Sequence, residues 1–331
     1  MLPKPPPREG PLGFLYLPPY RVQGVSTAGE STCVMIPELD LCFDMGECPR
    51  AALACKTVAL THGHMDHIGG LAYYFSQRHF QGMGTGKLVC DSRLTGAIHK
   101  MMAGYVDLEQ QRTPYEVVPI SPEQMVPLKQ GLFLRAFETE HTVPSLGYIV
   151  VEKRSKLKPE FDGFPQEKLR ELKERGIEIT RTLEIPLIAY TGDTRPGPHL
   201  VRDDVRKADL IITECTFFEP DHKERAKIGK HLHVSDLVEW LRIVECKAMI
   251  LVHVSRRTHL GEARSQLEKA VGRERAERVY FLMDSRFNRE RYDMQEQEAI
   301  AAEIAAGRLP PEAAEADDAR RANRGASSRP R

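Results

Sequence analysis

The sequence lacks the paired cysteines that a disulfide framework or a structural zinc knuckle requires. Its seven cysteines are odd in number, and no two of them form a CxxC pair. Also missing is any apolar run that approaches the roughly 18 residues needed to span a bilayer. The proline-rich residues 1–7 contain no apolar stretch typical of a signal peptide. We therefore expect reduced thiols, no membrane partner and a cytoplasmic location.

An excess of positive charge is absent as well. The chain has 47 Lys and Arg residues against 47 Asp and Glu residues. A nucleic-acid binder that is basic throughout is therefore not indicated, although a local basic patch can exist at zero net charge. With 331 residues and 41% hydrophobic content, the chain can bury one large core or two small ones.

Short apolar runs come first in the chain, and strand-like and helical segments then alternate, which predicts a layered α/β fold. The expected strands cover residues 14–17, 20–25, 32–36, 41–44, 57–60, 88–90, 115–119, 132–138, 187–191, 210–214 and 248–253. The expected helices cover residues 70–78, 92–104, 166–175, 234–246 and 261–273.

The domain organisation follows from changes in composition along the chain. We expect residues 1–12 to be a flexible leader and residues 13–290 to form the folded domain. Residues 291–331 should be helical at first and then a disordered basic tail. Residues 151–185 are dominated by Lys, Glu and Arg, so we expect an inserted arm that projects from the domain, with a helix over 166–175 as its one regular piece.

Three histidines and an aspartate fall within six residues, directly after the expected strand 57–60: His62, His64, Asp66 and His67. A loop that leaves a strand end can direct all four side chains toward two adjacent points. Imidazole and carboxylate groups suit zinc, and a catalytic zinc keeps one position open for water. The alternative, a polar loop with histidines clustered by chance, fits poorly because the whole chain has only 12 histidines.

This run matches the HxHxDH signature, and the chain thereby resembles the metallo-β-lactamase superfamily. The resemblance implies a four-layer αβ/βα sandwich with two metal ions at one edge, two Zn²⁺ per subunit or Mn²⁺ in their place. It also implies further ligands in the order His, Asp, His, and His141, Asp193 and His253 each follow an expected strand. By resemblance, one metal would be held by His62, His64 and His141, the other by Asp66, His67 and His253, and Asp193 would bridge them.

Four segments resemble ribonuclease Z in particular. Residues 157–161 and 167–169 of the insertion, together with Met65, resemble the short plant-type form of that family. Residues 141–148 (HTVPSLGY) and 214–217 (ECTF) are similar to family motifs, as are residues 230–235 (KHLHVS). Residues 253–257 resemble the family's H-F-S-x-R-Y, with Val254 and Thr258 where aromatic residues stand. The insertion 151–185 lies where that family carries an arm that grips tRNA.

The resemblance implies roles for further residues. His231 would protonate the leaving oxygen, Glu214 would orient it, and Asp66 would orient the attacking hydroxide. His233 would begin the following helix, but the reverse assignment of the two histidines stays open. For RNA contacts, the resemblance offers Ser255 and Arg257 beside the last ligand, and the charged arm offers Lys156 and Lys158. An exposed basic loop and a solvated insertion are the alternatives for these four residues.

The function implied is that of a zinc-dependent endoribonuclease that removes the 3′ trailer from precursor tRNA, with the protein acting as a homodimer. A second reading is another hydrolase of the same fold: a small-molecule phosphodiesterase, or an arylsulfatase-like or lactonase-like enzyme. Such an enzyme would keep the seven ligands but would have no use for a basic arm. A third reading is a metal-stabilised RNA-binding protein without activity, which would have no need for an open two-metal site.

Overall fold

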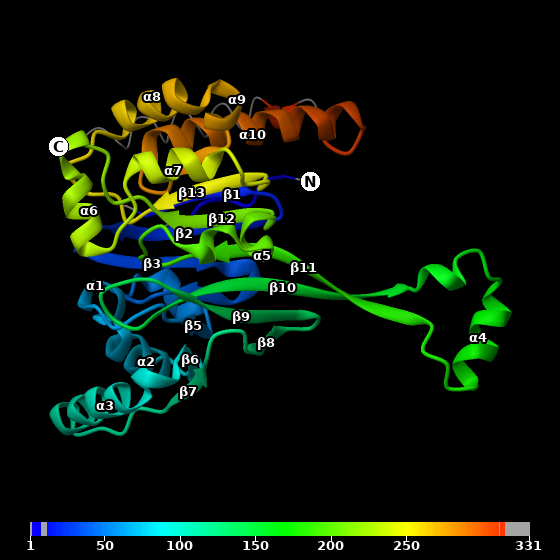
Figure 1. Ribbon diagram of the computed structural model, residues 1–331, viewed down its shortest axis with the longest axis horizontal. Helices are drawn as coiled ribbons and strands as arrows, with labels where there is room; N and C mark the ends of the chain where they lie inside the picture. Colours follow the sequence, from blue (N-terminus) through cyan, green and yellow to red (C-terminus); the bar gives the residue numbers. More distant parts are fainter. Residues whose placement is uncertain (1, 8–11, 311, 315–331) are drawn as a thin grey trace.

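The computed structural model describes residues 2–7, 12–310 and 312–314 (Figure 1). Two seven-stranded sheets pack face to face, and helices cover the outer face of each sheet. This arrangement is the expected four-layer αβ/βα sandwich. No helix in these described ranges is both long and apolar enough to cross a membrane.

The first sheet follows the order of the chain. Its strands are β1 (Gly13–Leu17), β2 (Tyr20–Thr27), β3 (Ser31–Ile36), β4 (Leu41–Phe43), β5 (Thr57–Ala59), β6 (Gly86–Asp91) and β7 (Tyr115–Ile120). Strands β1 to β4 pair antiparallel, whereas β4 to β7 pair parallel. Parallel pairs need crossover connections. Here α1 (Met65–Ile68) and α2 (Leu71–Phe80) form one crossover, and α3 (Thr95–Glu109) forms the next.

The second sheet repeats this plan. Its strands are β8 (Met125–Lys129), β9 (Leu132–Thr139), β10 (Ser145–Leu157), β11 (Thr180–Tyr190), β12 (Leu210–Glu214), β13 (Ala248–Val252) and β14 (Val279–Phe281). Strands β8 to β11 pair antiparallel, and β11 to β14 pair parallel. The remaining helices are α4 (Gln166–Glu174), α5 (Asp203–Arg206), α6 (Lys223–Gly229), α7 (Val234–Leu241), α8 (Leu260–Val271), α9 (Arg273–Ala276) and α10 (Ser285–Ala305).

The core lies in three layers that hold the sandwich together. Between the sheets, the ring of Phe43 from β4 stacks on that of Tyr190 from β11, with centroids 4.4 Å apart. Behind the first sheet, Phe75 of α2 belongs to a buried apolar cluster, and behind the second sheet Trp240 of α7 belongs to another. Buried strands read as nearly continuous apolar runs because both of their faces are covered.

The inserted arm differs from the expectation drawn from its sequence. The pattern predicts one helix as its only regular piece, but β10 and β11 continue out of the sandwich as a two-stranded ribbon that carries α4 at its far end (Figure 1). Pairing runs from Glu152 opposite Ile185 to Leu157 opposite Thr180. The sequence hid these strands because a backbone ladder needs no apolar side chains, and charged residues are frequent in the paired segments of both strands.

The end of α7 is a second correction. The sequence pattern predicts a helix through residue 246, but α7 ends at Leu241. The chain leaves the helix because its backbone bonds to the loop before β12. The amides of Glu245 and Lys247 donate to the carbonyls of Arg206 and Asp209, both at 2.9 Å. These hydrogen bonds position the chain so that β13 pairs with β12.

Both ends of the expected domain also differ. The boundary placed at residue 290 falls inside α10, which packs on β1 through an edge-to-face contact of Tyr292 with Phe14, at 5.6 Å between centroids. Within the expected flexible leader, Lys4 pairs with Glu38 at 3.1 Å, and Pro3 accepts a hydrogen bond from the Tyr292 hydroxyl. Residues 2–7 therefore contact the domain. The basic tail expected at the C-terminus falls almost wholly on residues 315–331, outside the described residues.

Candidate metal centre

The candidate site lies at one edge of the sandwich, where the carboxyl ends of strands from both sheets meet. This is the edge at which α/β folds place their chemistry. The structure brings together all seven residues that the sequence singles out as ligands. They come from the loop after β5 and α1, and from the loops after β9, β11 and β13: His62, His64, Asp66, His67, His141, Asp193 and His253.

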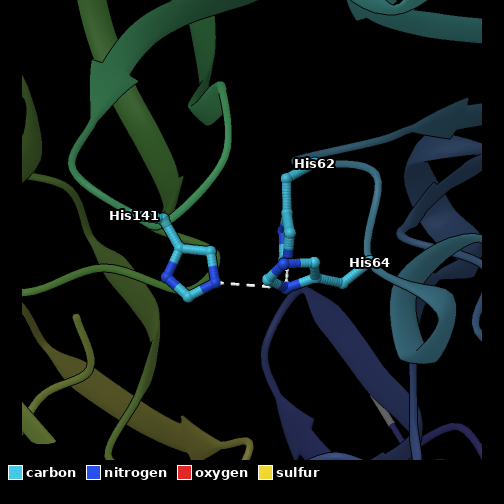
Figure 2. Close-up of side chains that lie close together, drawn as sticks. All are labelled: His62, His64 and His141. Carbon is cyan, nitrogen blue, oxygen red and sulfur yellow. Dashed lines mark hydrogen bonds between the residues drawn. The ribbon is translucent and has the colours of Figure 1, made fainter. Parts of the chain in front are cut away.

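Three histidines form the first group (Figure 2). His64 Nδ1 lies 3.1 Å from His62 Nε2 and 3.2 Å from His141 Nε2. Figure 2 shows the rings of His62 and His64 entering from one loop and that of His141 from another. Ligand atoms around a tetrahedral zinc with bonds of 2.0–2.1 Å would be about 3.3 Å apart. The spacing of these three nitrogens therefore fits a single small cation.

The second group faces the first. Asp66 Oδ2 lies 3.3 Å from His253 Nε2 and 3.8 Å from His67 Nε2. His67 Nε2 is buried and faces the carboxylates of Asp66 and Asp193 without a well-formed hydrogen bond among the described residues, which is costly for a polar atom unless a cation engages it. Asp193 Oδ2 lies 3.3 Å from the Nε2 atoms of both His67 and His253 and 3.9 Å from that of His62. One carboxylate thus reaches both groups, as a bridging ligand would.

The far ring nitrogens of these histidines are held from outside the cluster. The groups that hold them are Thr61 Oγ1 at 2.9 Å from His62 Nδ1, Asp44 Oδ2 at 2.9 Å from His67 Nδ1, Thr216 Oγ1 at 3.0 Å from His253 Nδ1 and the Lys230 carbonyl at 3.2 Å from His141 Nδ1. Such partners fix the orientation and tautomer of metal-binding histidines. The sequence patterns identified none of these four partners. Asp44 could have been found, because it directly follows a buried strand at this edge.

Asp44 is the most heavily engaged of these partners. Its carboxylate is fully buried and accepts hydrogen bonds from the Thr61 amide at 2.8 Å, the Thr61 hydroxyl at 2.9 Å and the Tyr190 hydroxyl at 2.9 Å. The fourth partner is the ring of His67. Four partners hold this buried charge in one position, so it can orient His67 without moving itself.

The electrostatics of the cluster match those of a cation site. Burial lowers the pKa of His62, His64 and His141, which keeps their rings neutral and their lone pairs free. Burial raises the pKa of Asp66 and Asp193, but the neighbouring histidines outweigh it and bring both values below the usual range. Both carboxylates are therefore ionised at neutral pH.

His67 differs from the other rings. Burial lowers its pKa, but Asp193 and Asp44 outweigh burial and raise that pKa well above the usual value. The two carboxylates thus favour a positive charge at this point of the site. A cation would take the place of the proton, which is the usual linkage between metal binding and proton release.

His231 lies beside the cluster and is held by Glu214. Glu214 ends β12, is fully buried and accepts four hydrogen bonds, including one from His231 Nδ1 at 2.9 Å and one from the Thr194 amide at 2.7 Å. Burial lowers the pKa of His231, but Glu214 outweighs it and raises the pKa to about 9. His231 Nδ1 is 4.0 Å from Asp193 Oδ2. The pair is therefore placed to carry a proton at the edge of the cluster.

His233, the other candidate for this role, has no free ring nitrogen. It is the N-cap of α7: its Nδ1 accepts from the Ser235 amide at 3.1 Å, and its Nε2 lies 3.0 Å from the Glu219 carbonyl. The carboxylate of Asp236 accepts from the His233 amide and completes a capping box. The geometry thus favours His231 and gives His233 a structural role.

The residues expected to contact RNA fall in two places. Ser255 and Arg257 lie in the loop that begins at His253, and Arg257 is exposed and makes no ion pair within the described ranges. Lys156 is on the ribbon of the arm, and Lys158 follows it and pairs with Glu178 at 3.3 Å. The ribbon extends away from the sandwich (Figure 1). The structure therefore brings the first two residues to the site and leaves the two lysines remote.

Two pockets are lined in part by residues at or beside the cluster. One, of about 690 Å³, is lined by His141, Thr142 and the residues around Pro198. Another, of about 300 Å³, is lined by His231 together with Arg195 and one side of α6.

Comparisons with known proteins agree with this geometry. A family model described as a beta-lactamase superfamily domain matches residues 46–254. The chain is 32% identical to tRNase Z TRZ2, chloroplastic, of Arabidopsis thaliana, over 76% of this chain and 72% of the relative. It is 31% identical to tRNase Z TRZ1 of the same plant, over 72% of this chain and 86% of the relative.

A solved structure supports the fold alone. The metallo-beta-lactamase fold protein YhfI from Bacillus subtilis superposes with a TM-score of 0.54 at 15% identity, over 82% of this chain and 97% of that protein. The two sheets and their flanking helices therefore follow a known plan.

Asp44 provides a test of the cation site. In the Asp44→Asn variant the shape of the side chain is kept, but the charge that orients His67 is lost. We expect the affinity for zinc, measured by competition with a coloured chelator, to fall about 10- to 100-fold. The Asp107→Asn variant, on the exposed side of α3, should bind zinc like the unmodified protein. Equal affinity in both variants would contradict the role given to Asp44.

Proposed function

Because the chain belongs to the ribonuclease Z family of the metallo-β-lactamase superfamily, we propose that it removes the 3′ trailer from precursor tRNA by hydrolysing one phosphodiester bond. Membership of this family makes the chain a metal-dependent hydrolase. The observation that carries the proposal is the convergence of seven ligand side chains next to a histidine held by a buried carboxylate. A water nucleophile and an acid for the leaving group are what phosphodiester hydrolysis requires.

We propose two divalent cations per subunit, with zinc preferred and manganese as the substitute. The first would be held by His62, His64 and His141, the second by Asp66, His67 and His253, with Asp193 shared between them. When bound, the cations would supply Lewis acidity toward the phosphoryl oxygens. Two observations support this assignment: the donor spacing, and the buried Nε2 of His67, which faces two carboxylates without a well-formed hydrogen bond among the described residues.

The protein's own residues would direct the proton transfers. Asp66 presents Oδ2 toward His253 Nε2 and accepts from the Gly29 amide at 3.1 Å, so its carboxylate is fixed and can orient the attacking water. His231 uses Nδ1 to bind Glu214 and keeps Nε2 for the leaving 3′ oxygen. Transfer of the proton from His231 would leave a tRNA with a 3′-hydroxyl and a trailer with a 5′-phosphate.

Substrate contacts would be divided between the site and the arm. Ser255 and Arg257 lie close to the scissile phosphate in this proposal, because they follow His253 directly and Arg257 is free of ion pairs in the described structure. Lys156 and Lys158 would hold the tRNA body at a distance, because the ribbon carries them away from the cluster. A substrate with a folded body and a flexible end fits this separation.

We also propose a homodimer in a reducing compartment, the cytoplasm. Apolar side chains on α2 and α3 support an interface, with Tyr73 56%, Phe80 79% and Leu108 80% exposed. All seven cysteines are free thiols, which supports the compartment.

His231 gives the first test of the proposed reaction. The protein should cut a precursor tRNA at the 3′ end of its mature sequence, and a chelator should abolish cleavage. The His231→Ala variant should cleave about 100-fold more slowly, because it lacks the acid for the leaving oxygen, yet should retain its zinc. Gel mapping of the cut and metal analysis measure the two effects.

The matched controls are His79→Ala, at the exposed end of α2, and His64→Ala. The first should behave as the unmodified protein, and the second should lose both zinc and cleavage. Loss of zinc from the His231 variant would refute its role as a proton donor.

The arm separates the proposed substrate from small phosphodiesters. Leu157 and Thr180 are the last paired residues of the ribbon, so an Asn-Gly turn can replace residues 158–179. This variant should lose at least about 10-fold in kcat/KM for precursor tRNA, because several charge contacts disappear. Hydrolysis of bis(p-nitrophenyl) phosphate should be unchanged. Equal loss on both substrates, or on neither, would favour a small-molecule hydrolase.

A further inference from the structure

Lys230 joins α6 to the segment that carries His231, and its backbone is left-handed, with φ of 53° and ψ of 52°. Glycine adopts this conformation freely, whereas other residues do so where their surroundings hold them in it. A lysine at this point therefore calls for contacts that fix it.

Those contacts form a closed pair with His141. The Lys230 ammonium donates to the His141 carbonyl at 2.9 Å, and His141 Nδ1 lies 3.2 Å from the Lys230 carbonyl. Each residue thus binds the backbone of the other with its side chain. We name these two hydrogen bonds the Lys230–His141 clamp. It joins loops that are 89 positions apart in the sequence.

The clamp acts on the cation site through the tautomer of His141. A carbonyl can only accept, so His141 Nδ1 must carry the proton and donate it to Lys230. The lone pair is then on Nε2, which lies 3.2 Å from His64 Nδ1 in the first ligand group. The ammonium of Lys230 fixes the other end of the same residue by holding its carbonyl.

The clamp also acts on the proton donor. His231 follows Lys230 directly, and its ring lies 5.0 Å from that of His141 between centroids. Glu214 holds the ring of His231, while the clamp holds the backbone on its N-terminal side. One residue therefore connects a ligand of the first group with the acid of the proposed reaction.

We propose that Lys230 is a positioning residue that couples cation retention by His141 to the placement of His231. The part that concerns His231 rests on the proposed function, whereas the part that concerns cation affinity does not. A direct contact between Lys230 and a substrate phosphate is the competing role. The ammonium already donates to a carbonyl in a half-buried position, which favours the positioning role.

The test compares three variants. Lys230→Met removes the ammonium and should weaken zinc binding, and lower kcat for bis(p-nitrophenyl) phosphate, by about 10-fold or more with KM unchanged. Lys230→Arg keeps a donor for the His141 carbonyl and should restore most of both. Lys230→Gly relieves the left-handed backbone but lacks the donor, so it should lose zinc affinity like Lys230→Met. Lys269→Met, an exposed lysine of α8, is the control and should change neither quantity.

The outcomes separate the alternatives. Unchanged zinc affinity in both Lys230→Met and Lys230→Gly would overturn the proposal, and so would a normal kcat with a raised, salt-dependent KM for tRNA. Should Lys230→Met fail to fold, as judged by circular dichroism, Lys230→Gly still decides between these results. If Lys230→Met lowers the zinc affinity but the unmodified protein cuts no precursor tRNA, the clamp is supported and the proposed function is refuted.

Discussion

The structure depends on one constraint: the lone-pair-bearing atoms of seven side chains are held close together at one edge of the sandwich. Histidine nitrogens 3.1–3.2 Å apart, and carboxylate oxygens 3.3 Å from histidine nitrogens, are unfavourable neighbours unless a proton or a cation lies between them. Hydrogen bonds from outside the cluster to the far ring nitrogens hold the histidines in this unfavourable arrangement. A cation at this edge would therefore stabilise the folded protein as well as act in catalysis.

The two halves of the sandwich supply these supports in the same way. In each sheet, one strand ends at or next to a fully buried carboxylate. Asp44 directly follows β4, and Glu214 is the last residue of β12. Asp44 anchors the ring of His67, and Glu214 anchors that of His231. The first histidine faces the ligand cluster and the second faces the leaving group in the proposed reaction. One buried carboxylate from each sheet thus anchors a histidine ring at this edge.

Much of the fold, and the convergence of the seven candidate ligands, could be predicted from the sequence because the signals are local. The HxHxDH run is contiguous, and each later candidate follows an apolar strand whose end defines the edge. The supports could not be predicted in the same way. His67 meets Asp44 from 23 positions away, Thr216 meets His253 from 37, and Lys230 meets His141 from 89. No short pattern in the sequence identifies such pairs.

The choice between His231 and His233 also needed coordinates, because only geometry shows which ring is already used as a helix cap. The ribbon of the arm was hidden for a different reason, since its strands are held by backbone pairing and carry charged side chains.

The most direct measurement of the central claim is anomalous diffraction at the zinc absorption edge from crystals of the protein grown with zinc. The account predicts two strong peaks about 3.5–4 Å apart, with the carboxylate of Asp193 between them. One peak should be surrounded by His62, His64 and His141, and the other by Asp66, His67 and His253. A single peak, or peaks away from this edge of the sandwich, would contradict the account.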